Sequence, residues 1–204
     1  MKALIFDFDG VIVLAREKMI EAYQHAFRRL LNKEVPSQKI AKALSPRVSQ
    51  VPIALGEDEN TAKKVAEFAF EWYNDHTTQD QLVPGVREFL ERAGRRYKLC
   101  IVSMNRRPYL ERVLRECGIS FPVVVTVEDV QEPRPHPEGL QLAMSMLSVS
   151  PEHTTVFGDT KQDMLAAKRA GCTAIGVLTG VEDEKGLREA GADEVLASVV
   201  DFPL

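Results

Sequence analysis

Short apolar runs alternate with amphipathic stretches over most of the 204-residue chain. Each run is rich in Val, Ile, Leu or Phe and is bounded by polar or turn residues, as in parallel strands that are buried on both faces. The stretches between them have helical spacing and ordinary start and stop signals, such as Pro108 near one start and Gly118 after its end. This alternation predicts a doubly wound α/β fold. The expected strands are Ala3–Phe6, Leu99–Val102, Val123–Val127, Thr154–Phe157 and Thr173–Leu178.

Residues from about 15 to 82 break this alternation. Two long stretches in this segment carry apolar residues at helical spacing, and no strand pattern lies between them. Pro84 and Gly85 then mark the return of the strand and helix alternation. We therefore expect a small all-helical module inserted after the first strand. The predicted domains are residues 1–14 and 83–204 for the α/β core and residues 15–82 for the inserted module.

Charge and composition limit the expected binding partners and the expected cellular compartment of the protein. The net charge of -4 and the pI near 5.7 argue against a nucleic-acid-binding protein, which is usually basic. No apolar run approaches the roughly 18 residues of a membrane span, so we expect no membrane partner. The three cysteines have no metal-ligand spacing and are interpreted as buried thiols in a reducing cytoplasm. The sequence leaves a monomer and a small homo-oligomer equally open.

Acidic residues follow two of the predicted strands. Asp7 and Asp9 come directly after the first apolar run, and Asp159 follows the fourth, with Asp163 one helical turn later. Ligands of open α/β sheets bind outside the carboxyl ends of the strands, so these acids are expected where a site should be. Taken alone, the first pair also fits a strand end with two solvated acids. Four converging carboxylates would repel one another without a cation, and an all-oxygen ligand set suits Mg²⁺.

Two further strands end near groups that could donate to a phosphate. Ser103 follows the second run and offers a hydroxyl. Arg134 lies between two prolines after the third run, and a guanidinium held there suits a phosphoryl group. Either residue alone also fits an ordinary strand-end serine or a surface-loop arginine. The functional interpretation gains weight because four successive strands place polar groups at the same sheet edge.

These motifs resemble those of the haloacid dehalogenase superfamily, specifically its phosphatase branch with a helical cap inserted after the first motif. The segment DFDGV looks like the first motif, and Ser103 looks like the second. The loop with Arg134 looks like the third motif, and GDTKQD looks like the fourth. The order, the spacing and the position of the insertion agree, and the resemblance runs from Lys2 to about Gly180.

The resemblance implies a role for each acid. Asp7 is the implied nucleophile that attacks phosphorus, and Asp9 is the implied acid that protonates the leaving oxygen and later activates water. Asp9 also favours phosphate esters over the dehalogenase and phosphonate-cleaving branches, which lack it. The implied Mg²⁺ ligands are the Asp7 carboxylate, the Asp9 backbone carbonyl and Asp159, while Asp163 supports the metal shell or orients Arg134.

The implied phosphate and substrate contacts include departures from the family pattern. Ser103 and Arg134 are expected to hold phosphoryl oxygens, although the family usually has lysine where this chain has Arg134. Asparagine usually follows the serine directly, whereas here Met104 separates Asn105 from it. The predicted substrate-binding residues are Gly10, Ser103, Asn105 and Arg134, with Arg47 of the inserted module as a candidate for a second anionic group.

Together these observations predict a Mg²⁺-dependent phosphatase that acts on a small phosphorylated metabolite through an aspartyl phosphate. Phosphoglycolate-like compounds and sugar phosphates are the leading substrate classes. A sugar phosphomutase similar to β-phosphoglucomutase would use the same four motifs and is the nearest alternative. A non-catalytic, phosphate-sensing relative is a third reading, which the retention of Asp7, Asp9, Asp159 and Asp163 disfavours.

Overall fold

The computed structural model describes residues 2–45 and 48–204, and it divides into two units. One unit comprises Met1–Leu14 and Thr78–Leu204, and the other is Ala15–Thr77. The second boundary lies earlier in the chain than the predicted residue 82. The reason is that the segment around Gln81 pairs with the continuation of the first strand, where the N–H of Leu14 donates to the Gln81 carbonyl over 2.6 Å.

The larger unit is built on a six-stranded parallel sheet with the strand order β3-β2-β1-β4-β5-β6. This is the order of a doubly wound fold. From β1 the chain adds β2 and β3 on one side, and then returns to add β4, β5 and β6 on the other side. The predicted α/β class is therefore confirmed. The strands are β1 Ala3–Phe6, β2 Lys98–Val102, β3 Val123–Val125, β4 Thr154–Gly158, β5 Thr173–Val177 and β6 Glu194–Leu196.

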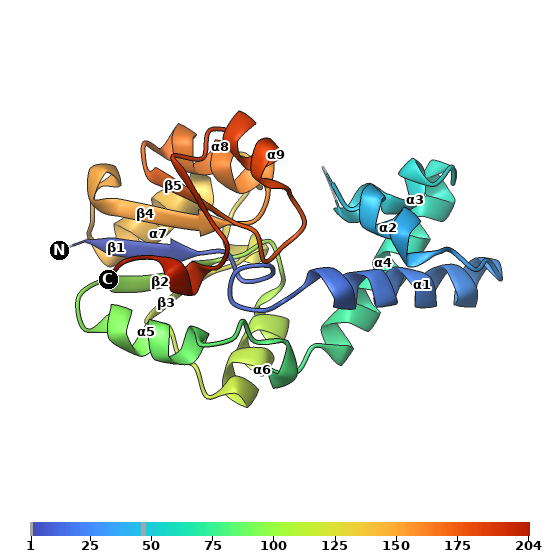
Figure 1. The fold of residues 1–204 in the computed structure, drawn as a ribbon, viewed down its shortest axis with the longest axis horizontal. Coiled ribbons are helices and arrows are strands. Elements are labelled where there is room, and N and C mark those ends of the chain that lie inside the picture. Colours follow the sequence, from blue (N-terminus) through green and yellow to red (C-terminus); the bar gives the residue numbers. More distant parts are fainter. Residues whose placement is uncertain (1, 46–47) are drawn as a thin grey trace. The chain divides into compact units, whose positions relative to one another are not determined.

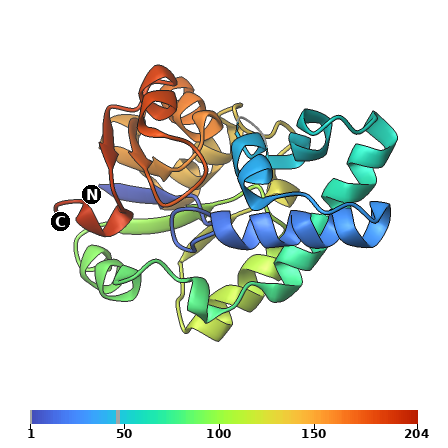
Figure 2. The same cartoon turned by 45° about the vertical axis from the view of Figure 1, so that its right-hand side comes forward.

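Helices cover both faces of this sheet, as Figures 1 and 2 show. In Figure 1, α5 and α6 lie below the strands, whereas α8 and α9 lie above them. The central strands β1, β2 and β4 are four to five residues long. Almost all of their residues are buried, as expected when helices cover both faces of the sheet. The helices are α5 Val86–Gly94, α6 Arg107–Cys117, α7 Glu138–Leu147, α8 Lys161–Ala170 and α9 Glu184–Glu189.

Alternate residues of β1 serve two different cores. Ala3 and Ile5 pack into an aliphatic cluster with residues of α7 and α8. Phe6 points to the other face, where its ring stacks on Phe157 at 5.1 Å between centroids and meets Phe89 of α5 edge-on at 6.4 Å. Both cores hold β1 rigidly, so the residues that follow it start from a fixed point.

Two strands differ from the sequence prediction by more than one residue. β3 ends at Val125 rather than Val127, because the hydroxyl and N–H of Thr126 bond to Asp129 and start a 3₁₀ turn at Val127–Asp129. β6 was not predicted at all, since this three-residue edge strand is half-exposed and carries no long apolar run. The predicted buried thiols are confirmed, since Cys100, Cys117 and Cys172 are free and buried.

The regular elements among the described residues of the smaller unit are all helices, as predicted. The helices α1 and α4 pack against each other, and Tyr23 of α1 is fully buried with its hydroxyl donating to the Val48 carbonyl over 2.7 Å. Asp58 caps α4 by accepting from two N–H groups of its first turn. Throughout residues 2–45 and 48–204, no helix has the length and apolar character that crossing a membrane requires. The helices are α1 Arg16–Leu31, α2 Ser37–Ala43, α3 Val51–Ala54 and α4 Glu59–His76.

Candidate active site

The loop after β1 places Asp7 at the carboxyl edge of the sheet. The N–H of Asp7 donates to the carbonyl of Phe157 on β4 over 2.9 Å, which ties the ends of the two strands together. The chain then reverses tightly, because the N–H groups of Ile12 and Val13 both donate to the carbonyl of Phe8. Asp7 is consequently fixed at the strand ends where doubly wound sheets bind their ligands.

The second pair of acids, Asp159 and Asp163, follows β4, which lies beside β1 in the sheet. Asp159 directly follows β4 and is 3 % exposed. Thr160 caps α8, and its N–H and hydroxyl both donate to Oδ2 of Asp163, whose own N–H donates back to the Thr160 hydroxyl. This capping box turns the Asp163 carboxylate back toward the start of the helix rather than out to solvent.

Arg134 links the two acid pairs. One guanidinium nitrogen, Nη2, donates to Oδ1 of Asp7 over 2.9 Å, and the other, Nη1, forms an ion pair with Oδ1 of Asp163. A hydrogen bond from α8 also holds the loop that carries Arg134, because the Arg169 guanidinium donates to the Pro135 carbonyl over 2.9 Å. Of the two implied roles for Asp163, the ion pair with Arg134 is therefore present in the structure.

Ser103 lies at the same edge, directly after β2. Its N–H donates to the Val125 carbonyl of β3, and the side chain is 3 % exposed. The hydroxyl oxygen accepts from the N–H of Asn105 over 3.1 Å, so one of its two lone pairs is engaged while its proton can still be donated to a ligand. Ser103 thus directly follows β2, the neighbour of β1, whereas Arg134 reaches Asp7 from the loop after β3.

Three carboxylates form a cluster that could hold a cation. Asp7, Asp159 and Asp163 are all buried, and each offers an oxygen within 4.8 Å of the others. Burial, together with the charge of nearby Asp7, raises the pKa of Asp159 from 3.8 to about 8. Arg134 is the cation that contacts the cluster directly, and it neutralises only part of the charge on three carboxylates. A hard divalent cation would fit this all-oxygen set.

Glycine backbone packs closely around Asp159. Gly10 has a φ of 86°, in the left-handed region that favours glycine, and a Cβ there would overlap the Asp159 carboxylate. A Cβ on Gly180, in the loop after β5, would overlap the same carboxylate from another side. The same loop fixes Asp159 and Gly10 by hydrogen bonds. Val181 donates its N–H to Oδ2 of Asp159 over 2.9 Å, and Thr179 donates its hydroxyl to the Gly10 carbonyl.

The Asp9 carboxylate departs from the expected convergence of four acids. Within the described part of the chain, the metal-competent cluster consists of the other three acids. The Asp9 carboxylate instead accepts from the Asn105 side-chain amide over 2.5 Å and from the Tyr109 hydroxyl over 2.9 Å. Asn105 and Tyr109 lie near Asp9 because α6 begins only a few residues after β2, the strand next to β1. The Asp9 backbone carbonyl, the ligand that the family resemblance implies, is a separate group, and its role stays a prediction.

Three contact residues were not foreseen from the sequence, and one predicted residue lies outside the structure. The only sequence feature of Tyr109 is its position four residues after Asn105. That spacing does not predict a hydrogen bond to Asp9. Val181 acts through its backbone N–H, which any residue could supply, and Thr179 follows an ordinary strand end. Arg47, the candidate for a second anionic group, lies outside the described residues.

Comparison with known families gives one clear match. The family model described as haloacid dehalogenase-like hydrolase matches residues 4–177, which include all four motif segments. Among curated proteins, the pyrophosphatase PpaX of Bacillus pumilus is 27 % identical over 206 residues, with 99 % of this chain and 94 % of the relative covered. The match therefore extends over the sheet and the inserted helices alike.

Solved structures with the same fold include differently assigned enzymes. A candidate β-phosphoglucomutase from Thermotoga maritima is 32 % identical with a TM-score of 0.71, covering 96 % of this chain and 94 % of that one. A predicted phosphoglycolate phosphatase from Haemophilus somnus has a TM-score of 0.82 at 19 % identity, covering 98 % and 96 % of the two chains. The second likeness shows the fold alone, because its sequence identity is low.

Proposed function

The chain belongs to the haloacid dehalogenase-like hydrolase family, and we propose that it is a Mg²⁺-dependent phosphatase that works through an aspartyl phosphate on Asp7. The observation that carries this proposal is the position of Asp7. Its carboxylate is a buried member of the three-acid cluster and accepts from Arg134 at the carboxyl edge of the sheet. This position would bring the proposed nucleophile, cation site and phosphate donor together, as phosphoryl transfer requires.

In the first half-reaction, an Asp7 carboxylate oxygen forms a bond to the phosphorus atom as the bond from phosphorus to the leaving oxygen breaks. The leaving oxygen takes a proton from the Asp9 carboxylic acid and departs as an alcohol or an equivalent product. Arg134 and the Ser103 hydroxyl donate to the phosphoryl oxygens, whose charge is redistributed in the transition state. The product of this step is a phosphoryl group bound to Asp7.

In the second half-reaction, Asp9 returns as the base. Its carboxylate takes a proton from a water molecule, whose oxygen attacks the phosphorus atom. The bond between phosphorus and the Asp7 oxygen then breaks, which releases inorganic phosphate and restores the Asp7 carboxylate. Two successive displacements of this kind replace one difficult hydrolysis.

A cation would be held by Asp7, Asp159 and Asp163, each of which offers a carboxylate oxygen within 4.8 Å of the others. The fit rests on the chemistry of the donors, since three buried carboxylates carry more negative charge than Arg134 can offset. When bound, Mg²⁺ supplies positive charge that stabilises the oxygens of the transferring phosphoryl group. Burial and then the charge of Asp7 raise the pKa of Asp159 to about 8, and a bound cation would offset both effects.

The proposed substrates are small phosphorylated metabolites, with phosphoglycolate-like compounds and sugar phosphates first. Inorganic pyrophosphate belongs in the same panel, because the relative from Bacillus pumilus is named a pyrophosphatase. Nucleic acids do not belong in it, since the chain carries a net charge of -4.

The first test is hydrolysis of p-nitrophenyl phosphate with Mg²⁺, with EDTA, and by the Asp7→Asn variant. We expect metal-dependent hydrolysis that is lost in the variant, and uncatalysed monoester hydrolysis is slow enough to leave a clean background. The metabolite panel is then assayed by phosphate release. Absence of turnover across the whole panel, in protein that is folded and binds Mg²⁺, would refute the proposed phosphatase.

A sugar phosphomutase is the second candidate function. The observation in its favour is the 32 % identity with the candidate β-phosphoglucomutase from Thermotoga maritima. A mutase would pass the phosphoryl group from Asp7 to a second sugar hydroxyl instead of to water. Supplying a hexose 1-phosphate with a catalytic amount of hexose bisphosphate separates the two functions, because only the mutase accumulates the isomeric hexose phosphate without releasing phosphate.

A further inference from the structure

Both oxygens of the Asp9 carboxylate accept hydrogen bonds from the same short segment of the chain. The Tyr109 hydroxyl donates to Oδ1 over 2.9 Å, and the Asn105 amide nitrogen donates to Oδ2 over 2.5 Å. A carboxylate with one donor on each oxygen is fixed in rotation as well as in position. Tyr109 belongs to none of the four motifs that identified the site in the sequence, and Asn105 was predicted only as a substrate-binding residue.

The two donors are themselves held in place. The Tyr109 side chain is 5 % exposed, and its ring meets Phe8 edge-on with 5.9 Å between centroids and 83° between planes. Phe8 precedes Asp9 and is fully buried, so the ring and the hydroxyl of Tyr109 contact two successive residues of one loop. The N–H of Asn105 donates to the Ser103 hydroxyl oxygen, which ties this residue to the end of β2.

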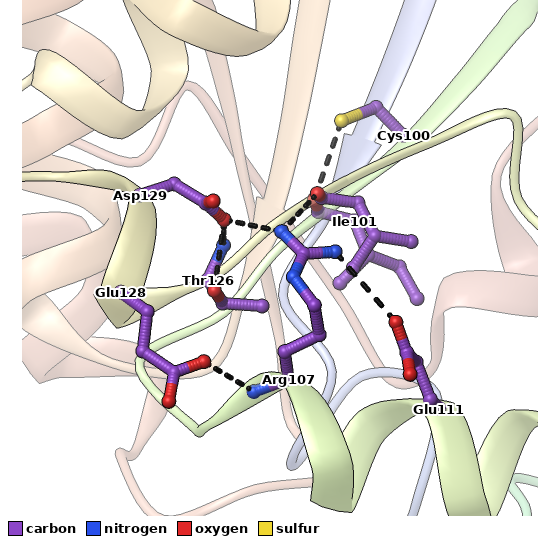
Figure 3. A network of polar contacts seen from close by, with 8 residues as sticks. Cys100, Ile101, Arg107, Glu111, Thr126, Glu128 and Asp129 are labelled. Carbon is purple, nitrogen blue, oxygen red and sulfur yellow. Dashed lines mark hydrogen bonds and ion pairs between the residues drawn. The ribbon is translucent and has the colours of Figure 1, made fainter.

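Arg107 lies between the two donors in sequence and is the first residue of α6. Figure 3 shows its contacts with Glu128 and Asp129. Its N–H donates to the Glu128 carboxylate over 3.0 Å, and its guanidinium donates to Asp129 over 2.6 Å. Asp129 in turn accepts from the hydroxyl and N–H of Thr126. The first turn of α6 is therefore clamped to the segment that follows β3, and Asn105 and Tyr109 flank the clamped residue.

We propose that Tyr109 and Asn105 are positioning residues that hold the Asp9 carboxylate in the orientation needed for proton transfer, an inference that rests on the proposed function. Asp9 must serve twice, first giving a proton to the leaving oxygen and then taking one from water. A side chain that shifted between the two half-reactions would lose reach, because proton transfer needs a heavy-atom separation of about 2.6–3.2 Å. The two donors and the ring contact with Phe8 keep Asp9 in one place through both steps.

A purely structural role for Tyr109 would leave a different kinetic signature. A buried tyrosine hydroxyl needs a partner in any case, and loss of packing would lower the active fraction for every substrate alike. Loss of positioning affects the acid step more strongly when the leaving group is basic. Phenolate, with a conjugate acid of pKa about 10, needs the proton far more than nitrophenolate does.

The test compares Tyr109→Phe with Tyr97→Phe on phenyl phosphate and p-nitrophenyl phosphate. Tyr97 is half-buried just before β2, at the opposite end of the sheet, so its variant is a matched control. For Tyr109→Phe we expect the first-turnover rate of phenol release from phenyl phosphate to fall roughly tenfold, because one charge-assisted hydrogen bond is lost. The first-turnover rate of nitrophenolate release from p-nitrophenyl phosphate should change less than about twofold, and Tyr97→Phe should match the parent on both substrates.

Asn105→Ala provides a second, independent variant and should show the same dependence on the leaving group. An equal loss in the first-turnover rate of leaving-group release on both substrates, or no loss on either, would overturn the positioning role. Parent enzyme and Asp9→Asn are measured in parallel to separate the two hypotheses. If Asp9→Asn retains full activity on phenyl phosphate, the proposed acid is wrong, and the inference about its positioning falls with it.

Discussion

The guanidinium of Arg134 lies 2.9 Å from Oδ1 of Asp7, so the loop after β3 supplies a cation to the first carboxylate after β1. The same guanidinium also pairs with Asp163 through its other terminal nitrogen. One side chain therefore joins acids that come from two strand ends. Lysine has a single nitrogen on a flexible stem and could not present two fixed donors in this way.

The Arg134→Met variant should lose most activity, whereas Arg134→Lys should keep part of it. Removing a donor that stabilises developing charge lowers kcat by about 10²–10³-fold, and we expect the methionine variant to fall in this range. The lysine variant keeps the charge, so a loss of roughly tenfold is expected. Steady-state kinetics on the best substrate measure both, with exposed Arg115→Met as the control. Equal activity of the lysine and methionine variants would contradict a role for the charge.

Mg²⁺ should stabilise the folded protein through the three-acid cluster. At a concentration about 100-fold above its dissociation constant, a ligand of the folded state adds about 2.7 kcal/mol to the free energy of unfolding. Thermal unfolding with and without Mg²⁺ measures the effect, and Asp159→Asn should abolish most of it. A shift of the same size in parent and variant would show that Mg²⁺ binds elsewhere.

The metal-free protein should lose stability as the pH rises. The pKa of Asp159 is raised from 3.8 to about 8 in the folded chain, so the folded state holds this proton over a range where the unfolded state has released it. This contribution is fully present below about pH 4 and is lost as the pH rises toward 8. Urea unfolding in EDTA at pH 5 and pH 8 should therefore show parent protein losing stability relative to Asp159→Asn. A constant difference between the two proteins would argue against the raised pKa.

Gly10→Ala should destabilise the protein more than Gly85→Ala. Both glycines have a positive φ, and a left-handed alanine costs about 1–2 kcal/mol at either position. Only at Gly10 would the new Cβ overlap the Asp159 carboxylate, whereas at Gly85 the nearest side-chain atom is 3.9 Å away. We expect Gly10→Ala to cost at least about 1 kcal/mol more in urea unfolding, because overpacking adds to the backbone strain. Equal costs would mean that the loop moves aside freely.

The order of strands and helices and the inserted helical unit could be predicted from the sequence. Buried parallel strands produce apolar runs such as that of β1, and helices with one buried face produce the matching periodicity. β6 was missed because a short edge strand with exposed Glu194 lacks that signal. Residues 78–82 were assigned to the inserted module because the pairing of Gln81 with Leu14 is a contact distant in sequence.

The site could be predicted where side-chain chemistry follows a strand directly. Asp7, Asp159 and Ser103 lie where the ends of parallel strands must bring them together. The rest depends on helix geometry and backbone groups. The contact between Tyr109 and Asp9 spans 100 positions, and the N–H of Val181 leaves no mark in the sequence because every residue except proline carries one.

The most direct test of the central claim is chemical trapping of the phosphoryl group on Asp7. The protein is mixed with Mg²⁺ and its best substrate, quenched within the first turnover, and treated with borohydride, which reduces an acyl phosphate to an alcohol. Peptide mass mapping should then find homoserine at position 7, only with substrate present and not in Asp7→Asn. Rapid turnover with no homoserine at position 7, or with homoserine at another aspartate, would contradict the proposed mechanism.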